Sequence, residues 1–170
     1  MELQKMETIL KEIEGALQAN LYYLAIVMAL TLPDICAALE AQDGRTSQNK
    51  YKAWYNANLA AKLSFLSADD CYSLRCGVVH QGKFGDRLTQ YDRPLFVLPS
   101  NAVFMNCKVA RPDGEFYLTS AAEFCLVMIA AVRQWFAAKG QDGVVKANLP
   151  NLMQYHPTGY GPVQGAGVIT

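Results

Sequence analysis

At residues 74–82 the chain reads Leu-Arg-Cys-Gly-Val-Val-His-Gln-Gly, which places an arginine and a histidine inside an apolar stretch. Ser67 lies shortly before it, with an aspartate three residues further on, a spacing typical of a capping box at the start of a helix. Gly82 is typical of a helix end. The pattern therefore predicts a helix over residues 68–81, with both polar residues toward its C-terminal end.

The segments on either side show the spacing of amphipathic or buried helices. Apolar residues recur every three or four positions, or run almost without interruption, on both sides of the 74–82 stretch. Pro33 followed by Asp34 predicts a fresh helix start. Asn20 either begins a new helix or lies within a longer one, and the sequence does not decide between them. The helices expected are residues 2–19, 20–31, 33–42, 48–66, 68–81 and, after a cap at Thr119 or Ser120, a long helix to about Lys139.

Between the last two helices the composition changes. Short runs rich in Val, Phe and Tyr, separated by Pro, Asn and Gly, predict a small antiparallel β hairpin or meander inserted at about residues 93–118. Proline and glycine recur through residues 141–170, which predicts an irregular C-terminal tail. The expected fold is mostly α: an up-and-down helical bundle forming one domain over residues 1–140, with the β insertion within it.

Charge is unevenly distributed along the 170 residues, although the formal net charge is zero. Residues 1–44 carry 2 basic and 7 acidic side chains, residues 45–111 carry 10 and 4, and residues 112–170 carry 3 and 4. Zero net charge excludes a strongly basic, non-specific nucleic-acid binder. The basic middle segment, which contains the 74–82 stretch, favours a polyanionic partner there, and an ordinary mixed-charge surface is the other interpretation.

Cysteine usage and hydropathy predict a cytoplasmic protein without a membrane segment. The five cysteines include no CxxC pair, and the acidic N-terminus shows no signal peptide. Cys36, Cys107 and Cys125 have apolar neighbours and are expected to be small core residues. The apolar run at residues 21–32 is well short of the roughly 20 residues that span a bilayer.

Arg75 and His80 carry the chemistry of the stretch. On an ideal helix they point about 140° apart, so they are not expected to form a close pair within one chain. The arginine fork suits a phosphate, and an imidazole, with a reference pKa near 6.5, suits proton transfer. If two such helices met about a two-fold axis, both pairs would converge on one cleft. This chemistry suits cleavage of an RNA phosphodiester, and neither a metal nor another cofactor is expected.

An arginine, four residues and a histidine at the end of a helix in a helical domain resemble the HEPN superfamily (higher eukaryotes and prokaryotes nucleotide-binding domains). The residues around the pair, from Asp70 to Gly82, are also similar to the family's helix. The resemblance covers the helical core, roughly residues 5–82 and 119–139. It implies an all-α bundle, usually dimeric.

The resemblance also implies a function. Many members are metal-independent endoribonucleases in toxin–antitoxin, phage-defence and RNA-processing systems. Arg75 and His80 would then form half of a composite site in a homodimer, with RNA as substrate and an antitoxin or regulatory protein as a further partner. Asp70 is a candidate for orienting Arg75, and Lys83 a candidate for contacting a neighbouring phosphate.

Other interpretations stay open. Some members of this superfamily only bind, and the cysteine after the arginine departs from active members, so a non-catalytic module recognising a nucleotide, RNA or a protein is the alternative function. In a purely structural interpretation, Arg75 pairs with Asp69 or Asp70 and His80 caps the helix. Cys76 and His80, four residues apart, would suit a thiol nucleophile and its base, although no third residue completes that site.

Two further features, a group of aromatic residues and the second histidine, can be explained without a functional role. Tyr51, Trp54 and Tyr55 lie beside lysines and would suit base stacking, but such a stripe is also typical of core packing. His156, in the tail, is expected at the surface.

Overall fold

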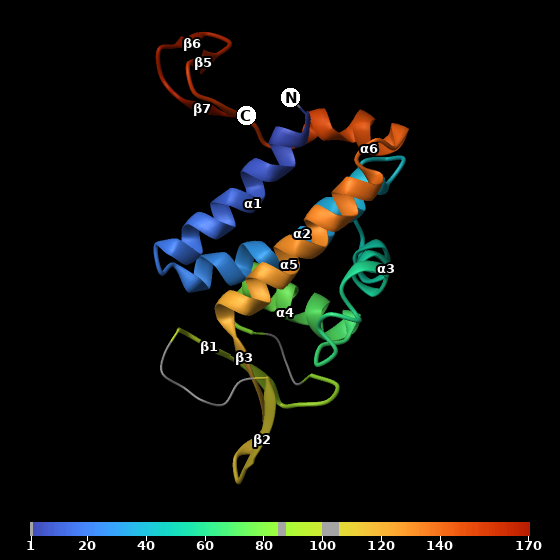
Figure 1. Cartoon of the computed structure of the whole chain (residues 1–170), viewed down its shortest axis with the longest axis vertical. Helices are drawn as coiled ribbons and strands as arrows, with labels where there is room; N and C mark the ends of the chain where they lie inside the picture. The colour runs from blue at the N-terminus through green and yellow to red at the C-terminus, as the bar shows by residue number, and fades with distance from the viewer. Residues whose placement is uncertain (1, 85–87, 100–105) are drawn as a thin grey trace.

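The computed structural model describes residues 2–84, 88–99 and 106–170, with side chains described from residue 5 onward, and helices dominate this part of the chain. This confirms the mostly α prediction. Figure 1 shows α1, α2 and α5 side by side, α3 and α4 packed against them, a small sheet at one end and the C-terminal segment at the other. The helices are α1 (Glu2–Gln18), α2 (Tyr22–Glu40), α3 (Gln48–Asn58), α4 (Ala68–Gln81), α5 (Ala121–Lys139) and α6 (Gly143–Asn148), followed by the 3-10 turn η1 (Leu149–Asn151).

The break between α1 and α2 falls at Asn20. Its φ of 59° is in the left-handed region, which asparagine tolerates better than most residues. The chain turns back there, and α2 runs alongside α1 (Figure 1). The structure thus decides the point that the sequence left open, in favour of two separate helices.

Helix α2 continues through Pro33, so the prediction of a helix start at Pro33 is wrong. Proline lacks an N–H and interrupts the hydrogen bonding of the turn before it. The hydroxyl of Tyr51 donates to the Leu30 carbonyl oxygen in that turn at 3.0 Å. Packing explains the rest, because α2 contacts α1, α3, α4, α5 and α6 and is the central helix of the core.

Helix α3 ends at Asn58, eight residues before the predicted end at residue 66. The segment after it forms tight turns whose apolar side chains, Leu59, Leu63 and Leu66, are buried in the core. The Tyr55 hydroxyl donates to the Leu66 carbonyl oxygen at 2.9 Å and fixes these turns against the helix. The apolar spacing of this segment therefore reflected burial, not helix.

Helix α4 has the predicted bounds. Ser67 caps its start and accepts a hydrogen bond from the Asp70 N–H, and the Asp70 carboxylate accepts one from the Ser67 N–H, which completes a capping box. Gly82 ends the helix with a φ of 65°. Helix α5 is also confirmed: Ser120 caps it through the backbone N–H of Glu123.

The β insertion is a mixed three-stranded sheet, not the predicted antiparallel one. Its strands are β1 (Arg93–Val97), β2 (Cys107–Arg111) and β3 (Gly114–Ser120), in the order β1-β3-β2. β2 and β3 form the expected antiparallel hairpin, but β1 runs parallel to β3 on its other edge. One of the apolar runs expected as strands is residues 102–109, and its first part, residues 102–105, lies outside the described residues.

The C-terminal segment has more regular structure than predicted. It contains α6 and η1, and then two short antiparallel pairs: β4 (Tyr155–His156) with β7 (Val168–Ile169), and β5 (Gly159–Tyr160) with β6 (Val163–Gln164). Asn148 holds α6 to the end of α2 by donating to the carbonyl oxygens of Leu39 and Ala41 at 3.1 and 2.8 Å. A glycine permits the tight turn between β5 and β6, at Gly161 with a φ of 57°.

Helices α2 and α5 are each long and apolar enough to cross a membrane by length and composition, with mean hydropathies of 1.8 and 1.4. Core helices of soluble proteins pass the same test, and about half of each helix is buried within this structure. The cytoplasmic location stays a prediction.

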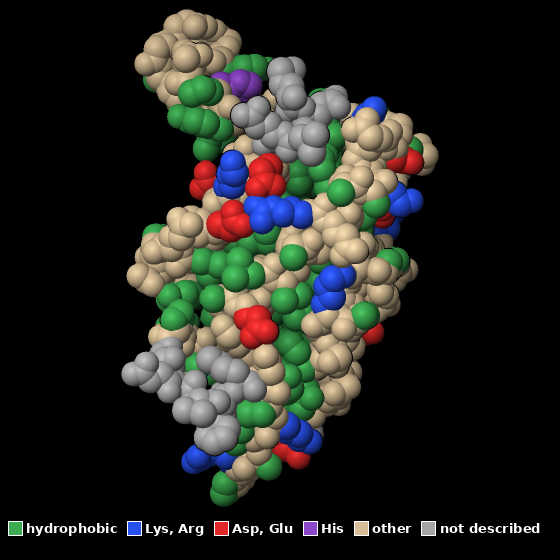
Figure 2. Space-filling model, viewed as in Figure 1, with side chains coloured by type: hydrophobic (Ala, Val, Ile, Leu, Met, Phe, Trp, Pro, Cys, Tyr) green, Lys and Arg blue, Asp and Glu red, His purple; other side chains and the backbone are tan. Residues whose placement is uncertain are grey.

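On the face shown in Figure 2, one group of charged side chains lies over α1 and α5, and others lie near the edges of the view. Arg133 of α5 donates to Glu14 of α1 at 2.8 Å and also pairs with Glu7. Hydrogen bonding to Arg133 lowers the pKa of Glu7. These charges therefore tie two core helices together across the surface.

Candidate functional site

The position of Arg75 is set by a carboxylate from another helix. Its Nε donates to Oδ2 of Asp34, in α2, at 2.6 Å, and the two side chains are only 20% and 11% exposed. Thr46 donates from Oγ1 to the other oxygen of Asp34 at 3.0 Å. The guanidinium is therefore anchored through Nε, while its two terminal nitrogens extend past the ion pair.

One of these terminal nitrogens reaches His80. Arg75 Nη1 lies 3.4 Å from His80 Nε2, and His80 is exposed in the last turn of α4. The expectation that the two side chains would not form a close pair is therefore wrong. Helical spacing places their Cα atoms on different faces, but the arginine side chain is long enough to cross that angle.

The surroundings keep Arg75 charged. Burial alone would lower the pKa of Arg75, but the Asp34 carboxylate and the Cys76 contact outweigh burial, so the pKa is raised. The guanidinium carbon lies 6.0 Å from the ring centre of Tyr72, within the range of a cation–π contact. Burial, helped by Cys76, raises the pKa of Tyr72, which keeps that hydroxyl protonated and able to donate a hydrogen bond.

Asp70 does not orient Arg75, contrary to the prediction. It is 4% exposed, and its carboxylate accepts hydrogen bonds from the Thr89 N–H and hydroxyl at 2.8 and 2.6 Å and from the Ser67 N–H at 3.2 Å. Burial alone would raise the pKa of Asp70, but these hydrogen bonds lower it overall. Asp70 therefore ties the start of α4 to the segment that follows it.

The ion pairs of α4 are not those expected if the motif were purely structural. Arg75 pairs with Asp34 and with neither Asp69 nor Asp70, and Asp69 forms an ion pair with Lys52 instead. Lys83 is exposed just after the end of α4, on the same end of the helix as His80.

A hollow of about 290 Å³ lies beside the anchoring carboxylate. Asp34, Thr46 and Asn148 line it together with apolar residues from the end of α2. The Arg75–Asp34 pair therefore stands between this hollow and the exposed imidazole of His80.

The aromatic side chains of α3 pack in the core, which was one of the two interpretations of their spacing. Tyr51, Trp54 and Tyr55 are at most 2% exposed. Of the cysteines expected in the core, Cys36 and Cys125 are buried and Cys107 is half-buried. His156, expected at the surface, is half-buried and its Nε2 lies 3.1 Å from the Thr170 hydroxyl.

Sequence reasoning missed the role of Asp34. A signal was present, because Asp34 is the single acidic residue in the otherwise apolar stretch 21–39. A carboxylate inside such a stretch needs a partner, since burying an unpaired charge is costly. Its partner lies 41 residues further along the chain, and no local pattern identifies it.

Among the residues that the structure describes, no group of three or more His, Cys, Asp or Glu side chains is arranged to hold a metal ion. The chain matches no protein-family model, no curated protein and no solved structure. The resemblance to HEPN proteins therefore depends on the residue pattern alone.

Proposed function

We propose that this protein is a HEPN-type endoribonuclease that cleaves RNA phosphodiesters without a metal, at a site built from Arg75 and His80. The observation that carries the proposal is the contact between Arg75 Nη1 and the exposed His80 Nε2, at 3.4 Å. It supports the proposal because it joins a phosphate-binding group and a proton-transferring group at one point on the surface.

Each residue has a role in this scheme. The terminal nitrogens of Arg75 bind the phosphate and stabilise the charge that develops on it. His80 accepts the proton of the ribose 2′-hydroxyl, whose oxygen attacks the phosphorus. The bond to the 5′-oxygen breaks, and that oxygen takes a proton. The products are a 2′,3′-cyclic phosphate and a free 5′-hydroxyl.

The scheme needs a proton donor as well as an acceptor. We place the donor on the second copy of His80, in a homodimer whose two α4 ends meet about a two-fold axis. Lys83, exposed beyond the end of α4, contacts a neighbouring phosphate. The proposed setting is cytoplasmic, in a toxin or phage-defence system, with an antitoxin or regulatory protein as a further partner.

One observation favours a second function, a non-catalytic module that binds RNA, a nucleotide or a protein. The Asp34 carboxylate lies 2.6 Å from Arg75 Nε, so its negative charge offsets the field of the positively charged guanidinium. A guanidinium paired in this way binds a phosphate through hydrogen bonds but stabilises a developing negative charge less.

The test is RNA cleavage by matched variants. Wild-type protein should convert a labelled single-stranded RNA into fragments ending in a 2′,3′-cyclic phosphate. His80→Gln and Arg75→Ala should each abolish that product. His156→Gln removes the other histidine of the chain, and Arg111→Ala removes an exposed arginine of β2, so both should cleave like wild type.

The outcomes separate the two functions. Wild-type protein that binds the RNA in a gel-shift assay but leaves it intact over a range of pH would support the binding module and overturn the nuclease. Equal cleavage by wild type and His80→Gln would overturn the catalytic role of His80. Protein that neither binds nor cleaves RNA, nucleotides or a partner protein would contradict both functions.

A further inference from the structure

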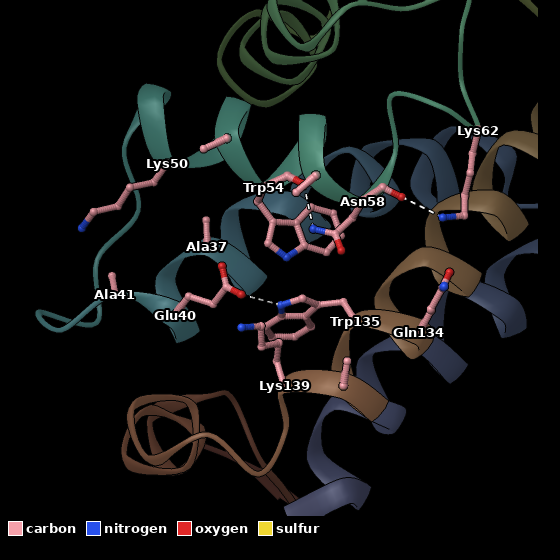
Figure 3. Close-up of a pocket in the computed structure, with 13 residues that line it drawn as sticks. Ala37, Glu40, Ala41, Lys50, Trp54, Asn58, Lys62, Gln134, Trp135 and Lys139 are labelled. Atoms are coloured by element: carbon pink, nitrogen blue, oxygen red, sulfur yellow. Dashed lines mark hydrogen bonds between the residues drawn. The ribbon is translucent and has the colours of Figure 1, made fainter.

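A second site lies where α2, α3 and α5 meet, in a groove of about 510 Å³ that Arg75 and His80 do not line. This volume is within the range of about 300–1,000 Å³ typical of small-molecule pockets. Figure 3 shows Trp54 of α3 and Trp135 of α5 next to each other in the lining of the groove. Small side chains leave the space between the helices open: Ala37, Ala41, Ala53, Ala57 and Ala138.

The two indoles differ in their hydrogen bonding. Trp135 Nε1 donates to Oε1 of Glu40 at 2.8 Å. Trp54 is 2% exposed, and its Nε1 is buried without a hydrogen-bond partner among the described residues. Buried polar groups nearly always have a partner, so an unpaired indole N–H calls for an explanation. Figure 3 shows this N–H directed toward the space that Glu40 and Trp135 also border.

The neighbouring indole, Trp135, indicates which kind of hydrogen-bond acceptor Trp54 lacks. The chain supplies a carboxylate to Trp135, through Glu40, and supplies none to Trp54. Glu40 is exposed at the edge of the same space, and its carboxylate is already engaged by Trp135. An acceptor brought by a ligand would complete the pair.

Lysines around the opening favour an acceptor that carries negative charge. Lys50, Lys62 and Lys139 line the groove, against one acidic residue, Glu40. Lys50 is held by Asp43 at 2.9 Å, and Lys62 donates to the Asn58 carbonyl oxygen at 2.9 Å. Lys139 is exposed at the end of α5, and its long side chain can turn toward a ligand bound in the opening.

We propose that this groove binds a small aromatic carboxylate. Its ring packs against the two indoles, which already lie in an edge-to-face arrangement with centres 6.0 Å apart. One carboxylate oxygen accepts the hydrogen bond of Trp54 Nε1, and the lysines at the opening supply the positive charge. This site is independent of the proposed ribonuclease centre.

The chain offers a direct readout, because its only two tryptophans both line the groove. The probe is 2-naphthoate, with the neutral 2-naphthamide as its matched control, titrated by isothermal calorimetry and by tryptophan emission. We expect saturable binding of the naphthoate with a change in emission, and binding of the amide weaker by about tenfold or more. Equal affinities, or no saturable binding of the naphthoate, would overturn the proposal.

Two pairs of variants locate the binding. Ala57→Leu fills the groove and should weaken naphthoate binding by about tenfold or more, whereas Ala137→Leu, at an exposed alanine of α5 outside the lining, should bind like wild type. Trp54→Phe keeps a ring but removes the N–H, and it should weaken the naphthoate more than the amide. Unchanged binding by Ala57→Leu, with its fold confirmed by circular dichroism, would contradict this site.

Discussion

At the scale of single residues, Asp34 determines where Arg75 lies. Its Oδ2 accepts a hydrogen bond from Arg75 Nε at 2.6 Å, and its Oδ1 accepts one from the Thr46 hydroxyl at 3.0 Å. Both members of the ion pair are largely buried, so solvent screens them less than it screens an ion pair at the surface. The Arg75–His80 contact therefore depends on a residue of α2 as much as on the spacing within α4.

Asp34→Asn should lower the free energy of unfolding by about 1–3 kcal/mol, because the ion pair with Arg75 is lost and the charged guanidinium keeps only a weaker hydrogen bond to a neutral amide. Urea unfolding followed by circular dichroism measures the change. The control is Asp113→Asn, which removes the highly exposed ion pair with Arg111 at 3.8 Å. It should lower the free energy of unfolding by less than about 0.5 kcal/mol. Equal losses in both variants would contradict the anchoring role of Asp34.

Asp70 should give the protein part of its acid sensitivity. Its pKa in the folded chain is lowered from the ordinary value of 3.8, so the unfolded chain binds the proton more tightly. Its stabilisation is therefore present above that ordinary value and is lost as pH falls through the lower folded pKa. Asp70→Asn should be less stable at pH 7 and should lose less stability than wild type between about pH 5 and pH 2. Parallel stability curves for the two proteins would contradict this role.

Residue roles could be predicted only where the partners are close in sequence. The capping role of Ser67 is readable because its partner is three residues away. The contacts of Asp34 with Arg75 and of Asp70 with Thr89 span 41 and 19 residues, and no spacing rule predicts them. The groove between Trp54 and Trp135 was missed for the same reason, since its walls come from distant parts of the chain.

At the scale of elements, α4 is the helix whose ends are best specified locally. Ser67→Ala removes the side chain that accepts the Asp70 N–H at 3.0 Å and should lower the free energy of unfolding by about 1 kcal/mol. The matched control is Ser73→Ala, in the middle of the same helix, where alanine is a good helix former and no comparable loss is expected. A loss in Ser73→Ala as large as in Ser67→Ala would contradict a specific cap.

Elements were mispredicted where tertiary packing outweighs a local signal. Pro33 marks a helix start in the sequence, but α2 is packed by helices along its length and continues through it. The apolar side chains within residues 59–66 fit a helical spacing. The segment nevertheless folds as turns, because its leucines are buried in the core and its end is held by the hydrogen bond from Tyr55. β1 runs parallel to β3, and periodicity carries no information about the direction in which a strand pairs.

At the scale of the whole molecule, the proposed site needs a second copy of the chain. Val79, next to His80 in the last turns of α4, is 43% exposed, as expected of a residue that packs against a partner helix. Val79→Glu places a charge at that contact. It should convert a dimer into a monomer in light scattering and abolish RNA cleavage while helical content is kept. Val163→Glu changes an equally exposed valine of β6 and should remain dimeric.

A wild-type protein that is a monomer at assay concentration, or a Val79→Glu protein that still dimerises and cleaves, would contradict the shared site. A monomer that cleaves RNA would instead place the whole reaction on one Arg75–His80 pair.

The most direct test of the central claim is the cleavage of a single-stranded DNA that contains one ribonucleotide. If Arg75 and His80 act on a ribose 2′-hydroxyl, the strand is cut only after that ribonucleotide, in the presence of a chelator, and leaves a 2′,3′-cyclic phosphate. The all-DNA strand stays intact, and so does the mixed strand with His80→Gln protein. Cutting of the all-DNA strand, or no cutting of the mixed strand by the wild-type dimer, would contradict the account.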